Sequence, residues 1–375
     1  MQAIPHAEHY EAAVTRAVLF DVSARTEVEV RGGDRASFLH NFCTQDIVNL
    51  PVGRGCEALL LDVQGRILAY VRILARQESL WIDSEPGLGP KIVQHLDRYL
   101  ITEQVALFDS TRELTQFHVA GPQAAALLTP VVGADLTTWQ HLQHADLEAF
   151  GVRCQVRRND MLSVPGYDLL FAATRNRTVL EGLTSLGIPQ ADMDTYHVLR
   201  IEAGTPFYGV DVDESNLPQE LNRDDRLLCF TKGCYLGQET VVRIRDRGHV
   251  NRFLVGLRFE RGSLQNQNPF PAIGGSPSAS GQRELPGDPS IPVSGQSPSA
   301  SGQRELPGEP PSIPPKTLLF HDGKEIGRIT SSAWSPRLAA VIALGYVRRG
   351  LHEPGTVLTA DGQSATVSAL PFLSH

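Results

Sequence analysis

The 375-residue sequence contains no apolar run near the roughly 20 residues that a membrane-spanning helix requires. Its first 20 residues carry acids and histidines where a secretory signal needs a basic start and an apolar core. The five cysteines are scattered and odd in number, which excludes a disulfide framework. These absences predict a protein of the reducing cytoplasm without a membrane partner.

Signatures of several common sites are also missing. There is no GxxxxGK[ST] phosphate loop, no GxGxxG after a strand, no CxxC pair, no HExxH and no GxSxG. The cluster Asp211, Asp213 and Glu214 lacks the spacing of a calcium loop, so these acids are interpreted as turn and capping carboxylates. Among the histidines, His40 and His197 are expected to be structural or solvated, and no metal site is predicted.

The charge balance is acidic, with 34 Lys and Arg against 42 Asp and Glu, a formal net charge of -8. This balance argues against a protein that coats DNA or a membrane surface, although a local basic patch stays compatible with it. With 41% hydrophobic residues, the chain is long enough for two or three domains with a sizeable core.

A low-complexity stretch interrupts the sequence at about 263–315. It holds 12 of the 25 prolines with 7 glycines and 10 serines, and the unit SPSASGQRELPG occurs at 276–287 and again at 297–308. Because little apolar surface offsets the entropy of ordering, a disordered loop insertion is predicted. A ligand for a proline-reading domain, with PxxP-like spacing at 286–289, is the alternative.

Strand-like and helical patterns alternate before this stretch, whereas the pattern after it is all β. Hairpins mixed with helices indicate an α+β fold rather than a doubly wound parallel sheet. The short strands that follow predict a small antiparallel barrel or sandwich, with the insert in one of its loops. Strands are expected at 27–31, 58–62, 66–75, 80–83, 116–120, 162–172, 253–259, 316–320, 324–331, 338–347 and 356–359. Helices are expected after Asp34 and at 91–100, 123–128 and 192–201.

The segment 231–252, TKGCYLGQETVVRIRDRGHVNR, departs from the acidic average. From 232 to 252 it has five basic residues and two acids, a local balance of +3. Two glycines bracket Cys234 in an expected tight turn, and the nearby cations favour its thiolate over its thiol. A buried, inert cysteine in a glycine-rich turn is the equal alternative.

Arginines alternate with other residues in the second half of this segment. Arg243, Arg245 and Arg247 are spaced two apart, which predicts that all three lie on one face of a strand. Such a face suits a phosphate, a carboxylate tail or RNA, and a solvated edge strand is the commoner alternative.

The run KGCYLGQE at 232–239 resembles the KGCYxGQE signature of the YgfZ-type folate-binding proteins. These proteins are relatives of the glycine cleavage T protein and are implicated in iron–sulfur cluster maturation. The resemblance implies two α+β folate-binding subdomains, at 1–115 and at 116–252 with the motif, and a C-terminal antiparallel β-barrel at 253–375 that the insert interrupts. Further similar segments follow in order at 38–53, 200–220, 248–259, 323–336 and 342–347.

The resemblance also implies a ligand and a role. It implies a tetrahydrofolate or another folate as cofactor, with Cys234 as a functional thiol. The implied function is an accessory role in iron–sulfur cluster assembly, insertion or repair, with client enzymes or assembly factors as partners and without independent turnover. The cofactor-binding residues that it implicates are Lys232, Gly233, Gln238, Glu239, Arg243 and Arg247.

One departure from the wider family affects the predicted activity. Glycine cleavage T proteins carry GGxxDD after the second strand, where an aspartate assists aminomethyl transfer. This sequence has Ala69 and Tyr70 in place of the two acids, and its closest text to the pterin-recognition run GYTGEDG is at 164–168. Since alanine cannot act as a general base, aminomethyltransferase activity is disfavoured.

Two alternatives stay open. The first is a tetrahydrofolate-dependent one-carbon transferase with a substituted site, which would take its carboxylate from Asp46, Asp62 or Asp211. The second and weaker one is an RNA-modification-associated protein that binds RNA through Arg243, Arg245, Arg247 and Arg252.

Overall fold

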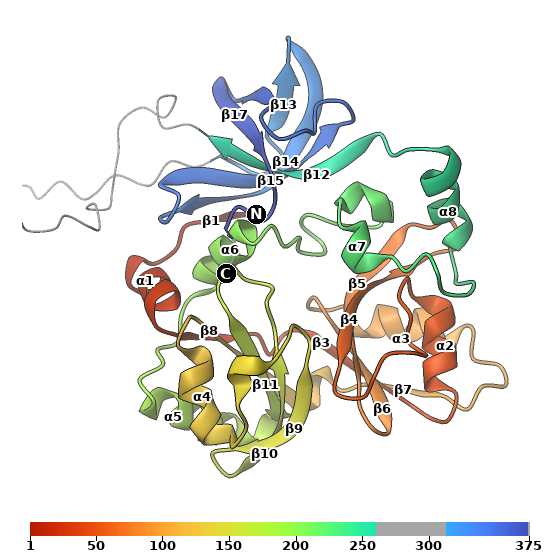
Figure 1. Cartoon of the computed structure of the whole chain (residues 1–375), viewed down its shortest axis with the longest axis vertical. Helices are drawn as coiled ribbons and strands as arrows, with labels where there is room; N and C mark the ends of the chain where they lie inside the picture. Colours follow the sequence, from red (N-terminus) through yellow and green to blue (C-terminus); the bar gives the residue numbers. More distant parts are fainter. Residues whose placement is uncertain (260–312, 374–375) are drawn as a thin grey trace, which may run out of the picture.

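The computed structural model describes residues 1–259 and 313–373. Its strands form three sheets, and each sheet is the centre of one part of the molecule (Figure 1). In the view of Figure 1 a β-barrel lies at the top, and two smaller sheets with their helices lie below it. No helix among the described residues is long and apolar enough to cross a membrane.

The first small sheet has five antiparallel strands in the order β4-β5-β6-β3-β7. Two helices, α2 (Arg35–Phe42) and α3 (Gly89–Asp97), share one buried apolar cluster with its strands. Every strand of this sheet except β7 was expected from the alternation of apolar residues. The strands are β3 (Thr26–Arg31), β4 (Gly55–Leu61), β5 (Ile67–Ala75), β6 (Ser79–Ser84) and β7 (Ala106–Asp109).

The second small sheet is also antiparallel, in the order β2-β8-β11-β10-β9. Residues from α4 (Ala124–Val132) and α5 (Asn176–Ser185) are buried with residues of its strands in one cluster. Its edge strand β2 precedes the whole first sheet in the chain, so the polypeptide visits this sheet twice. The strands are β2 (Val18–Asp21), β8 (Leu114–Ala120), β9 (His144–Ala149), β10 (Val152–Arg158) and β11 (Gly166–Ala172).

The third sheet is the barrel, in the order β1-β14-β13-β16-β17-β12-β15. A further pairing between β14 and β15 closes it, and all its ladders are antiparallel except that of the short edge strand β1. This confirms the predicted antiparallel barrel, while the predicted insert lies outside the described residues. The strands are β1 (Gln2–Ala3), β12 (Arg252–Phe259), β13 (Leu318–His321), β14 (Lys324–Ser335), β15 (Ala340–Arg348), β16 (Val357–Ala360) and β17 (Gln363–Ser368).

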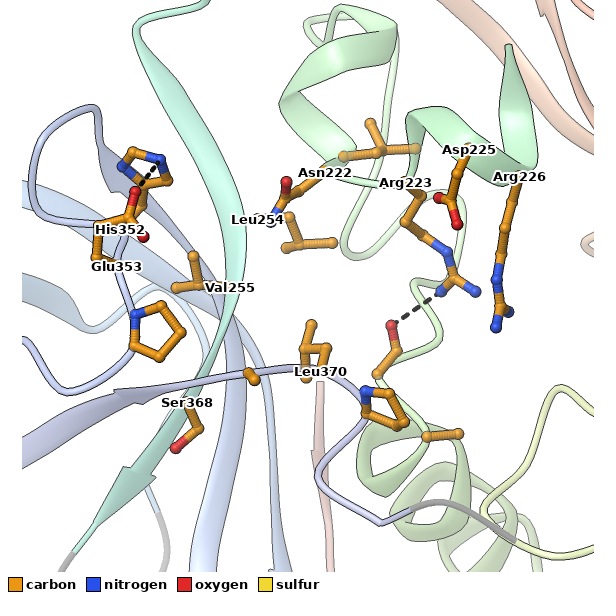
Figure 2. Close-up of a pocket in the computed structure, with 16 residues that line it drawn as sticks. Asn222, Arg223, Asp225, Arg226, Leu254, Val255, His352, Glu353, Ser368 and Leu370 are labelled. Atoms are coloured by element: carbon orange, nitrogen blue, oxygen red, sulfur yellow. Dashed lines mark hydrogen bonds and ion pairs between the residues drawn. The ribbon is translucent and has the colours of Figure 1, made fainter. Parts of the chain in front are cut away.

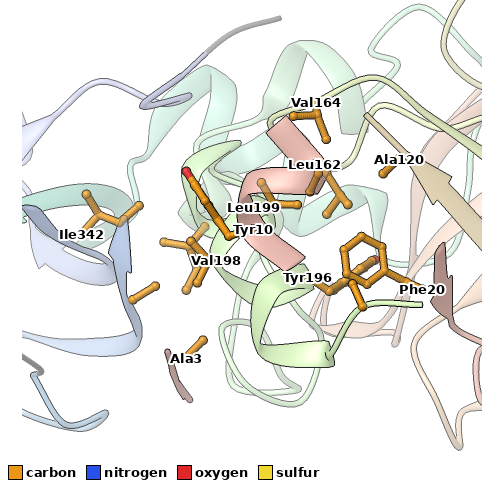
Figure 3. Packing of buried hydrophobic residues seen from close by; sticks show 14 of the residues in the cluster. Ala3, Tyr10, Phe20, Ala120, Leu162, Val164, Tyr196, Val198, Leu199 and Ile342 are labelled. Carbon is orange, nitrogen blue, oxygen red and sulfur yellow. The ribbon is translucent and has the colours of Figure 1, made fainter. Parts of the chain in front are cut away.

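Helix α6 (Met193–Glu202) joins the barrel to the second small sheet. Val198 of α6 lies in one apolar cluster with Tyr10 of α1 (Ala7–Thr15), Phe20 of β2 and Ile342 of β15 (Figure 3). At its end the fully buried Glu202 accepts hydrogen bonds from the hydroxyls of Tyr10 (2.5 Å), Ser163 (2.6 Å) and Ser335 (2.6 Å). These contacts fix the relative positions of the two parts. The 3-10 helices are Thr111–Glu113, Leu136–Thr138, Ala173–Arg175 and Pro218–Leu221.

The predicted strand carrying three arginines is wrong, because Gln238–Arg247 forms the helix α8. Gly237 precedes it with φ of 80°, a left-handed conformation that reverses the chain and starts the helix. Val241 is the buried residue of α8, and the carbonyl of that residue accepts a hydrogen bond from Gln219 at 2.8 Å. At 100° per residue Arg243 and Arg247 share a face, whereas Arg245 points elsewhere.

Other local expectations also differ from the structure. Asp34 stands at the N-cap of α2 as predicted, but its carboxylate accepts the N–H of Gln104 (2.8 Å) and caps no residue of the helix. The expected strand at 162–172 begins only at Gly166. Strands β9, β10 and β17 were not expected, because polar residues occupy many of their positions.

Candidate functional site

The KGCYLGQE segment forms a turn between α7 (Asp224–Leu227) and α8, packed against the first small sheet. The N–H of Leu236 donates to the carbonyl of Asn41 at 2.9 Å, and the N–H of Cys229 donates to that of Thr44 at 2.9 Å. A Cβ at Gly237 would lie 2.5 Å from the carbonyl oxygen of Asp62. The turn therefore fits closely on the loop after α2 and on the β4–β5 turn.

Lys232 is the buried anchor of this turn. Its ammonium donates to the carbonyls of Cys43 (2.8 Å), Gln45 (2.9 Å) and His40, and it lies 4.9 Å from the ring centroid of Tyr235. Burial lowers the pKa of this lysine. Since an ammonium has three donors, the loop carbonyls occupy all of them.

The other predicted site residues lie on the surface of the same region. Gly233 and Cys234 are exposed at the turn, so the reading of Cys234 as a buried, inert cysteine does not apply. Gln238 and Glu239 occupy the first turn of α8, and Arg243 and Arg247 lie one turn apart on its exposed face. The structure thus gathers all seven predicted residues around one turn and one helix.

A second thiol lies three residues before the motif and was not among the predicted site residues. Cys229 is partly exposed, and its Sγ lies 3.5 Å from the hydroxyl of Thr231. Partial burial raises the pKa of Cys229, but hydrogen bonds from Thr231 and Lys232 outweigh it and lower the pKa overall. Burial instead raises the pKa of Cys43 to about 11, which makes Cys43 unreactive.

A cavity of about 460 Å³ lies between the two small sheets, and we call it the central cavity. Side chains from β4, from the loop before β9, from the loop after β10 and from α7 line it. Their mixture of carboxylates and cations is typical of a polar ligand site. The residues that line it are Gly55, Cys56, Glu57, His141, Leu142, Asp160 and Arg226.

Glu57 is the charged centre of this cavity and is only 5% exposed. Its Oε1 lies 3.3 Å from His141 Nε2 and 3.8 Å from Arg226, and its Oε2 lies 4.0 Å from Arg223. Burial by itself raises the pKa of Glu57, but His141, Arg223 and the hydroxyl of Tyr70 stabilise the carboxylate and hold the pKa well below its usual range. These contacts favour the ionised form of Glu57.

The tautomer of His141 follows from its other ring nitrogen. Nδ1 accepts the backbone N–H of Asp160 at 3.0 Å, so in a neutral ring the proton sits on Nε2 and faces Glu57. The contact with Glu57 lacks hydrogen-bond geometry, and so does the 2.6 Å ion pair between Arg158 Nε and Asp160 Oδ1. Of these residues, Glu57, His141 and Asp160 line the central cavity, whereas Arg158 lies behind Asp160 and outside the lining.

Tyr70 connects this cavity to the run that lacks the acid pair. Its hydroxyl donates to Glu57 Oε2, and burial raises its pKa above the usual range. Ala69 is buried in the apolar core of the first sheet. A carboxylate from the neighbouring strand β4 therefore contacts the position where the family pattern places an aspartate.

A second cavity of about 350 Å³ lies between α7 and the barrel, and we call it the barrel-side cavity (Figure 2). Leu254, His352 and Leu370 of the barrel part line it opposite Arg223 and Arg226. The Nη1 of Arg223 donates to the carbonyl of Gly204 at 3.0 Å. Arg226 lines both cavities, so the two lie on either side of this residue.

Family models match both ends of this architecture. A model of the GCVT N-terminal domain matches residues 1–224, and a model of the glycine cleavage T-protein C-terminal barrel domain matches residues 305–373. The chain belongs to the glycine cleavage T-protein family. Membership of the YgfZ-type branch within this family stays a prediction.

Individual members of the family align with most of this chain. An aminomethyltransferase of Rubrobacter xylanophilus is 29% identical over 270 residues, which cover 72% of each protein. An aminomethyltransferase of Thermus thermophilus is 28% identical over 365 residues, covering 96% of this chain and 88% of that protein. The crystal structure of the glycine cleavage system aminomethyltransferase T from Bartonella henselae matches with a TM-score of 0.77 at 18% identity, covering 98% of this chain and 89% of that one.

The carboxylates proposed for a substituted transferase site in this family member lie away from both cavities. Asp46 accepts from Asn49, and Asp62 accepts the backbone N–H groups of Gln64 and Arg66 in the β4–β5 turn. Asp211 is buried and holds Arg200 at 2.8 Å. Their contacts are those of structural residues, whereas Glu57 and Asp160 line the central cavity.

The predicted RNA-binding arginines do not form one surface either. Arg245 pairs with Asp246 at 2.6 Å and lies 4.7 Å from the ring centroid of Phe230. Arg252 pairs with Glu220 at 3.0 Å. Of the described side chains, no group of three or more His, Cys, Asp or Glu is arranged to hold a metal ion.

Proposed function

We propose that this protein binds a tetrahydrofolate or a related folate in the central cavity and acts as an accessory protein for assembly, insertion or repair of iron–sulfur clusters in client enzymes. The observation that carries this proposal is the hydrogen bond from Tyr70, which stands in place of one of the two missing acids, to Glu57 of the neighbouring strand. It leaves a polar cavity for the ligand, and the acid beside the position of the missing pair is held by this hydrogen bond and has a lowered pKa.

The residues of the two cavities fit the chemistry of a folate. A pterin presents ring N–H donors, which match the carboxylates of Glu57 and Asp160. The glutamate tail carries carboxylates, which match the guanidinium groups of Arg223 and Arg226 between the cavities. A bound tetrahydrofolate supplies a reduced pterin that can carry a one-carbon unit.

The electrostatics of Glu57 favour binding over turnover. A carboxylate whose pKa is held well below its usual range is a weak base, and a general base works best with a pKa near the operating pH. Its partners Tyr70 and His141 also fix its orientation. Glu57 is therefore suited to accept hydrogen bonds from a ligand, not to remove a proton from it.

Calorimetric titration with tetrahydrofolate tests the binding site. We expect saturable binding to the wild-type protein and binding at least tenfold weaker in Glu57→Gln and in Asp160→Asn. The matched control is Glu148→Gln, an exposed glutamate on β9, which should bind like the wild type. Absence of binding to the folded wild-type protein would overturn the proposal.

The role of the exposed thiol is tested in cells. We expect Cys234→Ala to lower the activity of iron–sulfur enzymes while the folding and folate binding of the protein stay unchanged. Cys229→Ala serves as the control for a thiol in the same segment. Wild-type activity of iron–sulfur enzymes in the Cys234 variant would contradict this role.

A one-carbon transferase is the alternative, because Glu57 still supplies a carboxylate at the cavity wall even though its lowered pKa makes it a weak base. The measurement is turnover of a methylene or aminomethyl donor, followed by the absorbance of the folate. Turnover that Glu57→Gln abolishes would favour the transferase over the accessory protein.

A further inference from the structure

A groove of about 570 Å³ lies where β12, β15 and β14 run side by side in the barrel. We call it the arginine groove. Three arginines line it with one tyrosine, namely Arg252, Arg328, Arg348 and Tyr346, and Glu325 is the acid among its lining residues. It shares no lining residue with the central or the barrel-side cavity.

The strand register places the three cations on one face of the barrel wall. Arg252 stands directly opposite Arg348, and Arg328 stands directly opposite Tyr346. Directly opposed residues project from the same face, and Tyr346 and Arg348 share a face because they are two residues apart. Like charges placed directly opposite each other destabilise a sheet. An anion bound between the arginines would reduce this repulsion.

The carboxylates near the groove do not neutralise it. Arg252 pairs with Glu220 at 3.0 Å, and its guanidinium lies 4.8 Å from the ring centroid of Tyr346. Burial raises the pKa of Asp213, and its hydrogen bonds with Ser215 lower it. Arg328 and Arg252 lower this pKa further, by smaller amounts, which shows that both arginines lie near the carboxylate. Within residues 1–259 and 313–373, neither Arg328 nor Arg348 forms an ion pair.

The floor of the groove supplies a polar group without a partner. Tyr346 is 3% exposed, and its hydroxyl has no hydrogen-bond partner among the described residues. An unpaired buried hydroxyl costs stability, and an oxygen that accepts a hydrogen bond from it would remove that cost. Burial and the nearby Glu220, Asp211 and Asp213 raise the pKa of Tyr346, so its hydroxyl is a neutral donor and the positive charge of the groove comes from the arginines.

We propose that the arginine groove binds a phosphate or pyrophosphate group of a small molecule. Two guanidinium groups without carboxylate partners match a dianion, and the planar fork of arginine fits phosphate oxygens in pairs. Because Arg252 already covers the buried ring of Tyr346, no aromatic face is available to stack a base. Recognition is therefore by charge, and the site is separate from the proposed folate site.

Calorimetric titration with inorganic phosphate and with pyrophosphate at low salt tests this site. We expect saturable binding that weakens at least tenfold in Arg348→Gln and in Arg328→Gln and at least threefold in Tyr346→Phe. The control is Arg349→Gln, because this exposed arginine lies in the turn after β15 and does not line the groove. Thermal melting establishes that each variant is folded.

The outcomes separate this proposal from its alternatives. Absence of saturable binding to the wild type, or equal weakening in Arg349→Gln, would overturn it. A parallel titration uses a single-stranded RNA oligonucleotide without terminal phosphates. Binding of that RNA without binding of pyrophosphate would replace the small-anion site with an RNA surface.

Discussion

Lys232 shows how one residue of the KGCYLGQE motif acts on the loop beneath it. Its three donors are taken by carbonyls of residues 40–45, which hold the turn onto the first sheet. The resemblance assigned this lysine to the cofactor. Its contacts instead predict that it supports the turn on which Cys234 is exposed.

Replacing Lys232 with Met should lower the free energy of unfolding by about 3 kcal/mol, because three buried carbonyls lose a charged donor. Urea denaturation measures this change. Lys324→Met, at an exposed lysine of β14, should change stability by less than about 0.5 kcal/mol. A Lys232 variant with full stability but without folate binding would instead place the ammonium on the ligand.

His197 makes a prediction about pH. Burial and the neighbouring Arg200, whose Nε donates to His197 Nδ1 at 3.1 Å, lower the pKa of His197 to about 3. The unfolded chain has a histidine pKa near 6.5, so below that pH it binds a proton that the native state does not. Stability contributed by the neutral ring is thus present above pH 6.5 and is lost as the pH falls toward 3.

At pH 5 this loss amounts to about 2 kcal/mol relative to pH 7.5. His197→Asn keeps an acceptor for Arg200 and removes the titration, so its free energy of unfolding should fall by about 2 kcal/mol less between these pH values. Urea denaturation at both pH values provides the comparison. Equal losses in the two proteins would contradict the buried neutral histidine.

The sequence was informative about single residues where a contiguous motif carried the signal. It located Cys234 and its neighbours, and the structure places them around one turn. Glu57 could not be found in this way, because its partners His141 and Arg223 come from distant segments. The available local signal was an acid within the otherwise apolar run of β4.

At the scale of elements, alternation of apolar residues located strands of each sheet but missed the interior strands β10 and β17. It failed for α8, where arginines at every second position imitate a strand although the chain winds as a helix. The decisive feature there is Gly237, whose φ of 80° and contact with the β4–β5 turn set the direction of the helix. Such a tertiary contact is not visible in the periodicity of a segment.

The two glycines of the motif are a matched pair for an experiment. Gly237→Ala should lower the free energy of unfolding by about 2 kcal/mol or more, because the residue has a positive φ and its Cβ would meet the carbonyl of Asp62 at 2.5 Å. Gly233→Ala should be nearly neutral, since no atom lies within 4 Å of its Cβ position. Equal stability of the two variants would contradict the docking of α8, and loss of folate binding in Gly233→Ala alone would reveal a ligand contact.

At the scale of the whole molecule, buried charges hold the two small sheets together. Arg157 of β10 in the second sheet contacts Glu27 of β3 at 2.6 Å and Asp83 of β6 at 3.1 Å in the first sheet. Asp83 also pairs with Arg25 and Arg72. Single-strand patterns predicted strands of both sheets but not this junction, because its charges come from separate strands and meet only in the folded molecule.

Breaking this junction should destabilise the molecule as a whole. Arg157→Met removes a fully buried cation and leaves Glu27 and Asp83 with fewer partners, which should lower the free energy of unfolding by about 3–5 kcal/mol. Arg153→Met, at an exposed position of the same strand, is the control and should stay within about 0.5 kcal/mol of the wild type. If Arg157→Met unfolds at the same urea concentration as Arg153→Met, the junction does not hold the two small sheets together.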